Sequence, residues 1–132
     1  MIVDTSALIA ILFEEPEADE LIDILLDAGS SRMAAGSWIE VAAVLTRKDK
    51  GHLFAVASTV CQRFQIEIAA MTVAQAQIGH DAYLTLGLGT GHPARLNFGD
   101  CFAYALAKDS GEPLLFRGDD FIHTDVTPAI AR

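Results

Sequence analysis

The chain has 132 residues, 52% of them hydrophobic, and its 18 acidic and 9 basic residues give a net charge of −9. A chain of this length buries roughly two-thirds of its unfolded surface as one compact unit, so we expect a single domain over residues 1–132. The charge argues against non-specific nucleic-acid binding, which needs a basic surface. Because no apolar run approaches a membrane span and the two cysteines suit neither a metal site nor a disulfide framework, we expect a cytoplasmic protein without a membrane partner.

The sequence pattern predicts strands alternating with helices. The expected strands are 1–4, 32–35, 66–70, 114–116 and 126–127. The expected helices are 5–13, 16–28, 37–48, 53–64, 72–86 and 97–109. Apolar residues recur at helical spacing in the longer helices, and Gly29 and Gly111 mark two helix ends. Strands that alternate with helices imply a parallel sheet joined by right-handed crossovers.

Polar residues at helix starts predict the local capping contacts. The expected caps are Thr5 or Ser6, Ser37 with Glu40, Thr72 with Gln75, and Asn97. Ser37 and Thr72 each precede an acid or amide by three residues, which is the capping-box spacing. These signals fix where we expect each helix to begin.

Four acidic positions fall where strands pass into helices: Asp4, Glu40, Asp100, and either Asp119 or Asp120. Each has a structural alternative: a helix cap, a capping-box glutamate, a residue stabilised by the helix dipole, or a solvated turn. In a parallel sheet, however, every strand-to-helix junction opens on the same edge. The predicted topology therefore brings all four acids to one crevice.

Clustered carboxylates predict a cation site. Two unit charges about 4 Å apart repel by about 4 kcal/mol at an effective dielectric near 20. Such a crevice therefore takes up protons or binds a cation. Oxygen-only ligands suit Mg²⁺ or Mn²⁺, and these ions support attack of water on a phosphodiester. The acids thus indicate a metal-dependent nuclease.

Several short motifs carry a family resemblance over essentially the whole chain. They are Asp4-Thr5-Ser6-Ala7, Glu40, Asn97-Phe98-Gly99-Asp100-Cys101 and Gly118-Asp119-Asp120-Phe121. Together they resemble a PIN domain, and most closely the VapC-type toxin ribonucleases of bacterial toxin–antitoxin pairs. The chain departs from the family pattern at Gly118, where many members carry an acid.

The resemblance implies a fold and an activity. The implied fold is a PIN-like three-layer α/β/α sandwich with a central, mostly parallel twisted sheet. The implied activity is a Mg²⁺- or Mn²⁺-dependent endoribonuclease, the toxin of a toxin–antitoxin system, which cleaves a defined RNA such as tRNA or rRNA by a metal-activated water. It also implies a homodimer and a VapB-type antitoxin as partners.

Carried onto this sequence, the family pattern assigns roles to individual residues. Asp4 and Asp100 are the implied metal ligands, supported by Glu40 and by Asp119 or Asp120, and Asp4, Glu40, Asp100 and Asp119 form the implied catalytic quartet. Thr5, Ser6 and Arg95 are candidates for substrate binding. Arg47, Lys48 and Lys50 have two readings, as contacts to RNA phosphates or as a solvated helix end.

Other functions remain open at this stage. A haloacid-dehalogenase-like phosphohydrolase also begins with a strand-end aspartate, but it needs a second aspartate where this chain has Ser6. A phospho-acceptor receiver domain needs adjacent acids after the first strand, and these are missing. A PIN-fold or receiver-like acidic pocket that binds or regulates without nuclease activity is the non-enzyme alternative.

Overall fold

The computed structural model describes residues 1–130, which form four strands, six α-helices and one short 3₁₀ helix. In chain order these are β1 (Ile2–Val3), α1 (Thr5–Leu12), α2 (Ala18–Ala28), β2 (Ser31–Ala34), α3 (Ala35–Arg47), η1 (Gly51–Leu53), α4 (Phe54–Arg63), β3 (Ile66–Ala69), α5 (Val73–Leu86), α6 (Asp100–Ser110) and β4 (Leu114–Leu115). Over this part of the chain, no helix combines the length and the apolar character that crossing a bilayer requires.

The four strands form one parallel sheet in the order β3-β2-β1-β4. Ile2 of β1 lies opposite Arg32 of β2 and opposite Leu114 of β4. β2 and β3 pair along their whole length, from Ser31 opposite Ile66 onward. The predicted parallel sheet is confirmed.

The predicted last strand at 126–127 is wrong. Leu114 donates its N–H to the carbonyl of Thr127 and accepts from the N–H of Ala129, both at 2.8 Å, which leaves an isolated bridge opposite Pro128. Pro128 lacks an N–H group with which to extend the ladder. The segment therefore touches β4 without becoming a strand.

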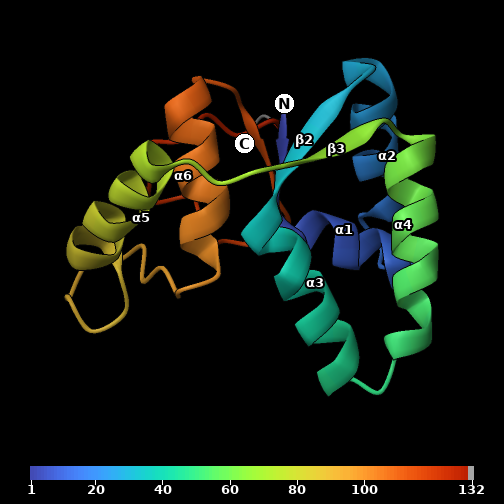
Figure 1. The fold of residues 1–132 in the computed structure, drawn as a ribbon, viewed down its shortest axis with the longest axis horizontal. Coiled ribbons are helices and arrows are strands. Elements are labelled where there is room, and N and C mark those ends of the chain that lie inside the picture. The colour runs from blue at the N-terminus through green and yellow to red at the C-terminus, as the bar shows by residue number, and fades with distance from the viewer. Residues whose placement is uncertain (131–132) are drawn as a thin grey trace.

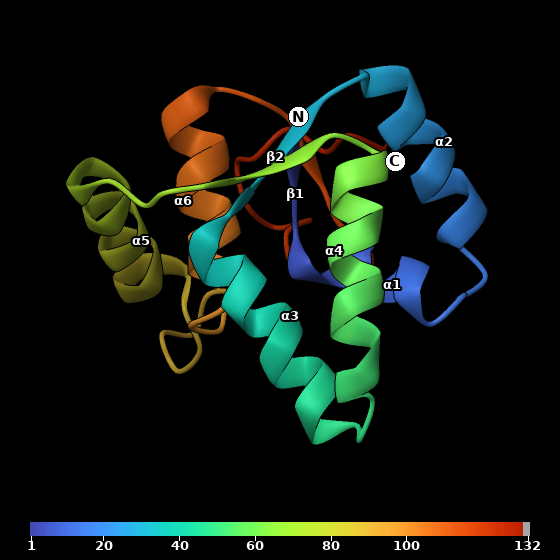
Figure 2. The same ribbon diagram turned by 45° about the vertical axis from the view of Figure 1, so that its right-hand side comes forward.

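Helices cover both faces of the sheet because successive strand residues point to opposite sides. Ile2 and Leu114 pack in one core cluster with buried side chains of α5 and α6. Their neighbours Val3 and Leu115 pack in a second cluster with α1, α2, α3 and α4. Figures 1 and 2 show this layering, with α5 and α6 on one side and α2 and α4 on the other. The predicted α/β architecture is confirmed.

The local signals in the sequence have mixed outcomes. Gly29 and Gly111 end α2 and α6 with positive φ angles, as predicted. The capping box at Thr72 is also present. The capping box at Ser37 is wrong, because β2 passes directly into α3 at Ala35 and Ser37 lies within the helix. Glu40 is therefore not a capping residue.

The carboxyl ends of the strands meet where the strand order reverses. β1 is flanked by β2, which follows it in the chain, and by β4, which comes last. Such a reversal opens a crevice above the sheet edge in α/β folds. Asp4 is the first residue beyond β1, and the loop from Arg117 to Asp120 follows β4. α6 runs back toward the start of β4, so its first residue, Asp100, lies at the same edge.

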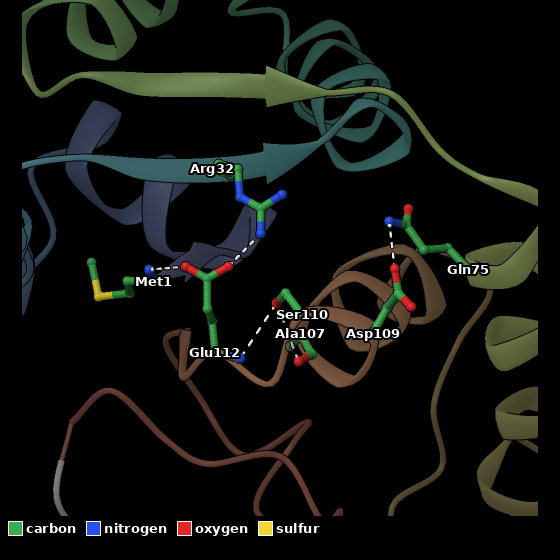
Figure 3. A network of polar contacts seen from close by, with 7 residues as sticks. All are labelled: Met1, Arg32, Gln75, Ala107, Asp109, Ser110 and Glu112. Atoms are coloured by element: carbon green, nitrogen blue, oxygen red, sulfur yellow. Dashed lines mark hydrogen bonds and ion pairs between the residues drawn. The ribbon is translucent and has the colours of Figure 1, made fainter.

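At the opposite edge of the sheet, Glu112 joins the beginnings of three strands. Its Oε1 accepts a hydrogen bond from the N-terminal amino group of Met1 at 2.8 Å, and its Oε2 pairs with the guanidinium of Arg32 (Figure 3). Met1 precedes β1, Arg32 belongs to β2, and Glu112 precedes β4. The hydrogen bond from the amino group, followed by that from Arg32, lowers the pKa of Glu112 to about 2.

We predict that Glu112→Gln lowers the free energy of unfolding near neutral pH. The loss should be about 1 kcal/mol, since the carboxylate is partly exposed and solvent screens its ion pairs. A lowered pKa stabilises the fold above the ordinary carboxyl pKa, and this stabilisation is lost as the pH falls toward about 2. In urea unfolding, the difference between variant and wild type should therefore narrow as the pH falls through this range.

The control is Asp23→Asn, which removes an exposed carboxylate from α2. This variant should unfold like the wild type. Equal losses in the two variants would mean that the Glu112 contacts add nothing to stability.

Candidate functional site

Five acidic side chains line one cleft of about 490 Å³ above the carboxyl ends of β1, β2 and β4. One of them, Glu15, is paired with Arg117, and the other four are Asp4, Glu40, Asp100 and Asp120. Burial is the largest cause of the raised pKa of Asp4 and of Asp100, and the negative charges of Glu40 and Asp120 raise both further. The four carboxylates thus form one electrostatic unit.

Asp4 is buried at the end of the central strand and caps α1. Its Oδ2 accepts hydrogen bonds from the Ser6 backbone N–H at 3.0 Å and from the Ser6 hydroxyl at 2.6 Å. Its Oδ1 is buried and has no hydrogen-bond partner. Burial raises the pKa of Asp4 to about 6, against the opposing effect of the Ser6 hydrogen bonds. One oxygen is therefore fixed and the other is available to a ligand.

Asp100 is held in a similar way at the start of α6. Its Oδ2 accepts from the backbone N–H of Asn97 at 3.0 Å, while the Asn97 side-chain oxygen accepts from the Asp100 N–H at 2.9 Å. This reciprocal pair resembles a capping interaction one turn before the helix, near the place predicted for Asn97. Burial, followed by the charge of Asp4 among the raising effects, shifts the pKa of Asp100 to about 7.

Glu40 enters the cleft from the second turn of α3. Its carboxylate packs against the backbone at Gly99, where an added Cβ would overlap the Glu40 carboxylate. Gly99 thus lets the loop before α6 approach α3 closely. This contact sets Glu40 beside the segment that carries Asp100.

The structure distinguishes the two adjacent aspartates that follow β4. Asp120 lines the cleft with the other three acids, whereas Asp119 lines a separate cavity of about 370 Å³ together with Arg95. Gly118, at a φ of 92°, turns the chain just before them. Of the two alternatives that the sequence left open, Asp120 is therefore the one that lies in the cleft with Asp4.

The predicted substrate-binding residues have different positions. Thr5 is buried, and its hydroxyl donates to the carbonyl of Ser37 at 3.1 Å, which ties α1 to α3. Ser6 contacts Asp4 and also accepts from the backbone N–H of Arg117 at 3.0 Å. Arg95 lies outside the cleft. Thr5 and Ser6 thus hold the site together, and Arg95 lies in the adjoining cavity, which Asp120 also lines.

Arg117, which follows β4 and lines the cleft, is a site residue that was not predicted from the sequence. Its guanidinium pairs with Glu15 at 2.9 Å and lies 3.6 Å from Glu17. Its place directly after a buried strand, before Gly118, was the available signal.

The donor set fits a divalent cation that keeps much of its water. Within residues 1–130, no three His, Cys, Asp or Glu side chains are already grouped to hold a metal ion. Mg²⁺ binds through as few as one or two carboxylates and retains several waters. Asp4, with its unpartnered buried Oδ1, and Asp100 supply two such carboxylates. A cation there would also offset the repulsion among the four acids.

We predict that Asp100→Asn raises the stability of the protein in EDTA near pH 8. A raised pKa means that the folded state holds its proton more tightly than the unfolded state. The stability from Asp100 is therefore complete below about 3.8 and lost as the pH rises through about 7. Removing the charge should increase the free energy of unfolding by roughly 1 kcal/mol or more at the higher pH, with little effect near pH 4. Thermal unfolding across this range measures the difference.

Asp23→Asn controls for the loss of one negative charge, since Asp23 is exposed on α2. This control should leave the pH dependence unchanged. A lower melting temperature for Asp100→Asn at pH 8 would show that Asp100 acts chiefly as a helix-start residue.

We predict that Gly99 and Glu40 are coupled by about 1 kcal/mol. Gly99 has a helical φ of −62°, where alanine ordinarily stabilises a fold by reducing the freedom of the unfolded chain. In the wild-type background the added Cβ meets Glu40, so this gain should be absent or reversed. In a Glu40→Ala background the gain should reappear. A double-mutant cycle in urea measures the coupling.

Gly51→Ala is the control, because a Cβ at Gly51 meets no atom within 4 Å. Its effect should be the same with and without Glu40. A Gly99→Ala effect that is also independent of Glu40 would exclude the close approach.

Comparisons with known proteins agree with this geometry. The sequence matches the PIN domain family over residues 1–126. The ribonuclease VapC42 of Mycobacterium tuberculosis is 45% identical over 129 residues, which cover 98% of each chain.

Two solved structures share the fold at lower identity. VapC20 of M. tuberculosis, a sarcin–ricin loop cleaving toxin, is 15% identical with a TM-score of 0.71, over 96% of this chain and 95% of that chain. A toxin–antitoxin complex from Klebsiella pneumoniae is 18% identical with a TM-score of 0.63, over 91% and 88%. With the family match and the near-complete coverage of VapC42, these likenesses lead to one conclusion: the chain belongs to the PIN domain family, among the VapC ribonucleases.

Proposed function

We propose that this chain is a divalent-metal-dependent endoribonuclease and the toxin of a toxin–antitoxin pair. The observation that carries the proposal is the buried, unpartnered Oδ1 of Asp4 in a cleft shared with Glu40, Asp100 and Asp120. Its relatives are ribonucleases by name, and nucleases with a PIN domain generally use divalent metal ions. The activity and the cleft therefore point to the same chemistry.

The four carboxylates have different roles in this proposal. Asp4 and Asp100 hold the cation, while Ser6 and Asn97 orient them by hydrogen bonds to one oxygen of each. Glu40 and Asp120 remain to position the attacking water and accept its proton. A bound cation would supply Lewis-acid activation of water and offset negative charge at the phosphodiester.

The chemistry of the donors favours Mg²⁺ or Mn²⁺. All candidate ligands are carboxylate oxygens, which suit hard cations, whereas the histidines and cysteines that zinc prefers do not line the cleft. Both ions accept octahedral oxygen ligation. We therefore expect either to support cleavage.

The substrate is a defined RNA rather than RNA in bulk. A chain with a net charge of −9 gains little from non-specific attraction to phosphates. A structured target supplies the missing selectivity, and the related fold of VapC20 belongs to a toxin that cleaves the sarcin–ricin loop. rRNA and tRNA are accordingly the first substrates to test, and the cytoplasm is the expected site of action.

A VapB-type antitoxin and a second copy of the chain are the proposed protein partners. The Klebsiella complex with the same fold contains a toxin and an antitoxin. An antitoxin with a basic side chain would neutralise the acidic cleft. Exposed apolar side chains at Ile39 on α3 and at Val73 and Leu84 on α5 support a homodimer.

We predict that Asp120→Asn abolishes metal-dependent RNA cleavage, whereas Asp119→Asn keeps it within about twofold of wild type. Each change removes one charge from the same turn, but only Asp120 lines the cleft. Loss of a residue that transfers a proton in the reaction typically lowers the rate by about 10²-fold or more. Cleavage of purified rRNA and tRNA is followed with Mg²⁺, with Mn²⁺ and with EDTA.

Discrete cuts that require metal and disappear in Asp120→Asn would establish the activity and the fourth acid together. Loss of cleavage in Asp119→Asn alone would restore the assignment predicted from the sequence. Cleavage that persists in EDTA would overturn the metal-dependent mechanism. Tight RNA binding without cleavage under every condition would favour the alternative of a PIN fold that only binds.

A further inference from the structure

The acidic cleft also contains positive charges at the end farthest along α3. Arg47 and Lys48, at the end of α3, line the same cleft as Asp4 and Glu40. Both side chains are exposed to solvent. A cleft with carboxylates at one end and cations at the other matches a ligand that carries several phosphates along its length.

The spacing along α3 explains how one helix supplies both charges. Glu40, Val44 and Arg47 follow each other at four and three residues, so they lie on one face of the helix. The rise from Glu40 to Arg47 is about 10 Å over two turns. This separation is too long for an ion pair between them. A phosphate at Arg47 would belong to a neighbouring nucleotide rather than to the reacting one.

Arg47 and Lys48 differ from the paired cations of this protein. Arg32 and Lys108 form salt bridges with Glu112 and Asp125, respectively, outside the cleft. Within residues 1–130, neither Arg47 nor Lys48 has a salt bridge. The dipole of α3 explains why basic residues are favoured at its last turn. It does not explain why Arg47 and Lys48 lie in the same cleft as the acids.

Arg117 lines the cleft too, but its position is different. Its guanidinium pairs with Glu15, and Glu17 lies close by. Its backbone N–H donates to the Ser6 hydroxyl. Arg117 is therefore part of the wall that supports Asp4, and its charge is already balanced within the chain.

We propose that Arg47 and Lys48 bind a backbone phosphate of the RNA one or two nucleotides from the scissile bond. The inference rests on the proposed function and adds to it the direction in which the strand leaves the acids, along α3. Val44, which lies between Glu40 and Arg47 on α3, lines the cleft and would face the intervening nucleotide. Arg47 and Lys48 would recognise the charge of the phosphate and would not distinguish one base from another.

The test is the salt dependence of RNA binding. The probe is a labelled single-stranded 20-mer RNA of mixed sequence, bound to full-length protein that carries Asp100→Asn so that it is not cut. In this background, Arg47→Gln/Lys48→Gln should weaken binding by about tenfold at moderate salt and reduce the slope of log K against log salt by about 1, as expected for one or two lost phosphate contacts.

Arg63→Gln/Lys108→Gln is the matched control. It removes two exposed charges that do not line the cleft, so the net charge changes equally. The control should lower the slope by much less. An unchanged slope in Arg47→Gln/Lys48→Gln, or an equal change in both pairs, would overturn the inference. Thermal unfolding of both variants checks that the fold is intact.

Cleavage by proteins that retain Asp100 separates this inference from the proposed function. If the wild type cuts RNA, Arg47→Gln/Lys48→Gln should raise KM about tenfold and leave kcat within about twofold. If the wild type cuts no RNA but the salt slope still falls as expected, the proposed function fails and the phosphate site stands. If the wild type cuts RNA, but the KM and the salt slope of Arg47→Gln/Lys48→Gln match those of the control pair, the phosphate site fails and the proposed function stands.

Discussion

The site depends on a carboxylate buried at the end of the central strand. Asp4 gives up its hydration, and Ser6 returns hydrogen bonds to only one of its oxygens. A buried polar atom without a partner costs about 1–3 kcal/mol. Ser6 also accepts from the backbone of Arg117, so the same hydroxyl joins the ends of β1 and β4. The fold therefore keeps a carboxylate oxygen without a hydrogen-bond partner at the point where the strand order reverses. A cation that binds this oxygen supplies the missing interaction.

Much of this arrangement could be predicted from the sequence. The alternation of strands and helices predicted a parallel sheet, and parallel strands place Asp4 and the start of α6 at one edge. Two details were beyond the sequence. Ser37 and Glu40 have capping-box spacing, but β2 runs directly into α3 and places Glu40 in the second turn. Asp119 and Asp120 are equivalent in the sequence, and only the path of the chain after Gly118 separates them.

Net charge proved a poor guide to function because the charges are unevenly partnered. Glu112 is balanced by the amino group of Met1 and by Arg32, and Asp125 is balanced by Lys108. The cleft holds the opposite case. Apart from the paired Glu15 and Arg117, its four acids and two cations have no salt bridge within residues 1–130. The net charge of −9 is a sum over the whole chain, and it does not describe how acidic and basic side chains are distributed within the cleft.

The two edges of the sheet show how one topology serves stability and function together. Where the strands begin, hydrogen bonds from the amino group of Met1 and from Arg32 lower the pKa of Glu112, and these contacts join three strands (Figure 3). Where they end, burial, and then the charges of the neighbouring carboxylates, raise the pKa of Asp4 and of Asp100. A divalent ion and a basic side chain from an antitoxin would both relieve that same repulsion. Each cation neutralises the negative charge that attracts the other. By thermodynamic linkage, binding of either one therefore lowers the affinity of the cleft for the other. Under the proposed function, an antitoxin that inserts a cation would therefore lower the metal affinity of the cleft as well as block RNA from it.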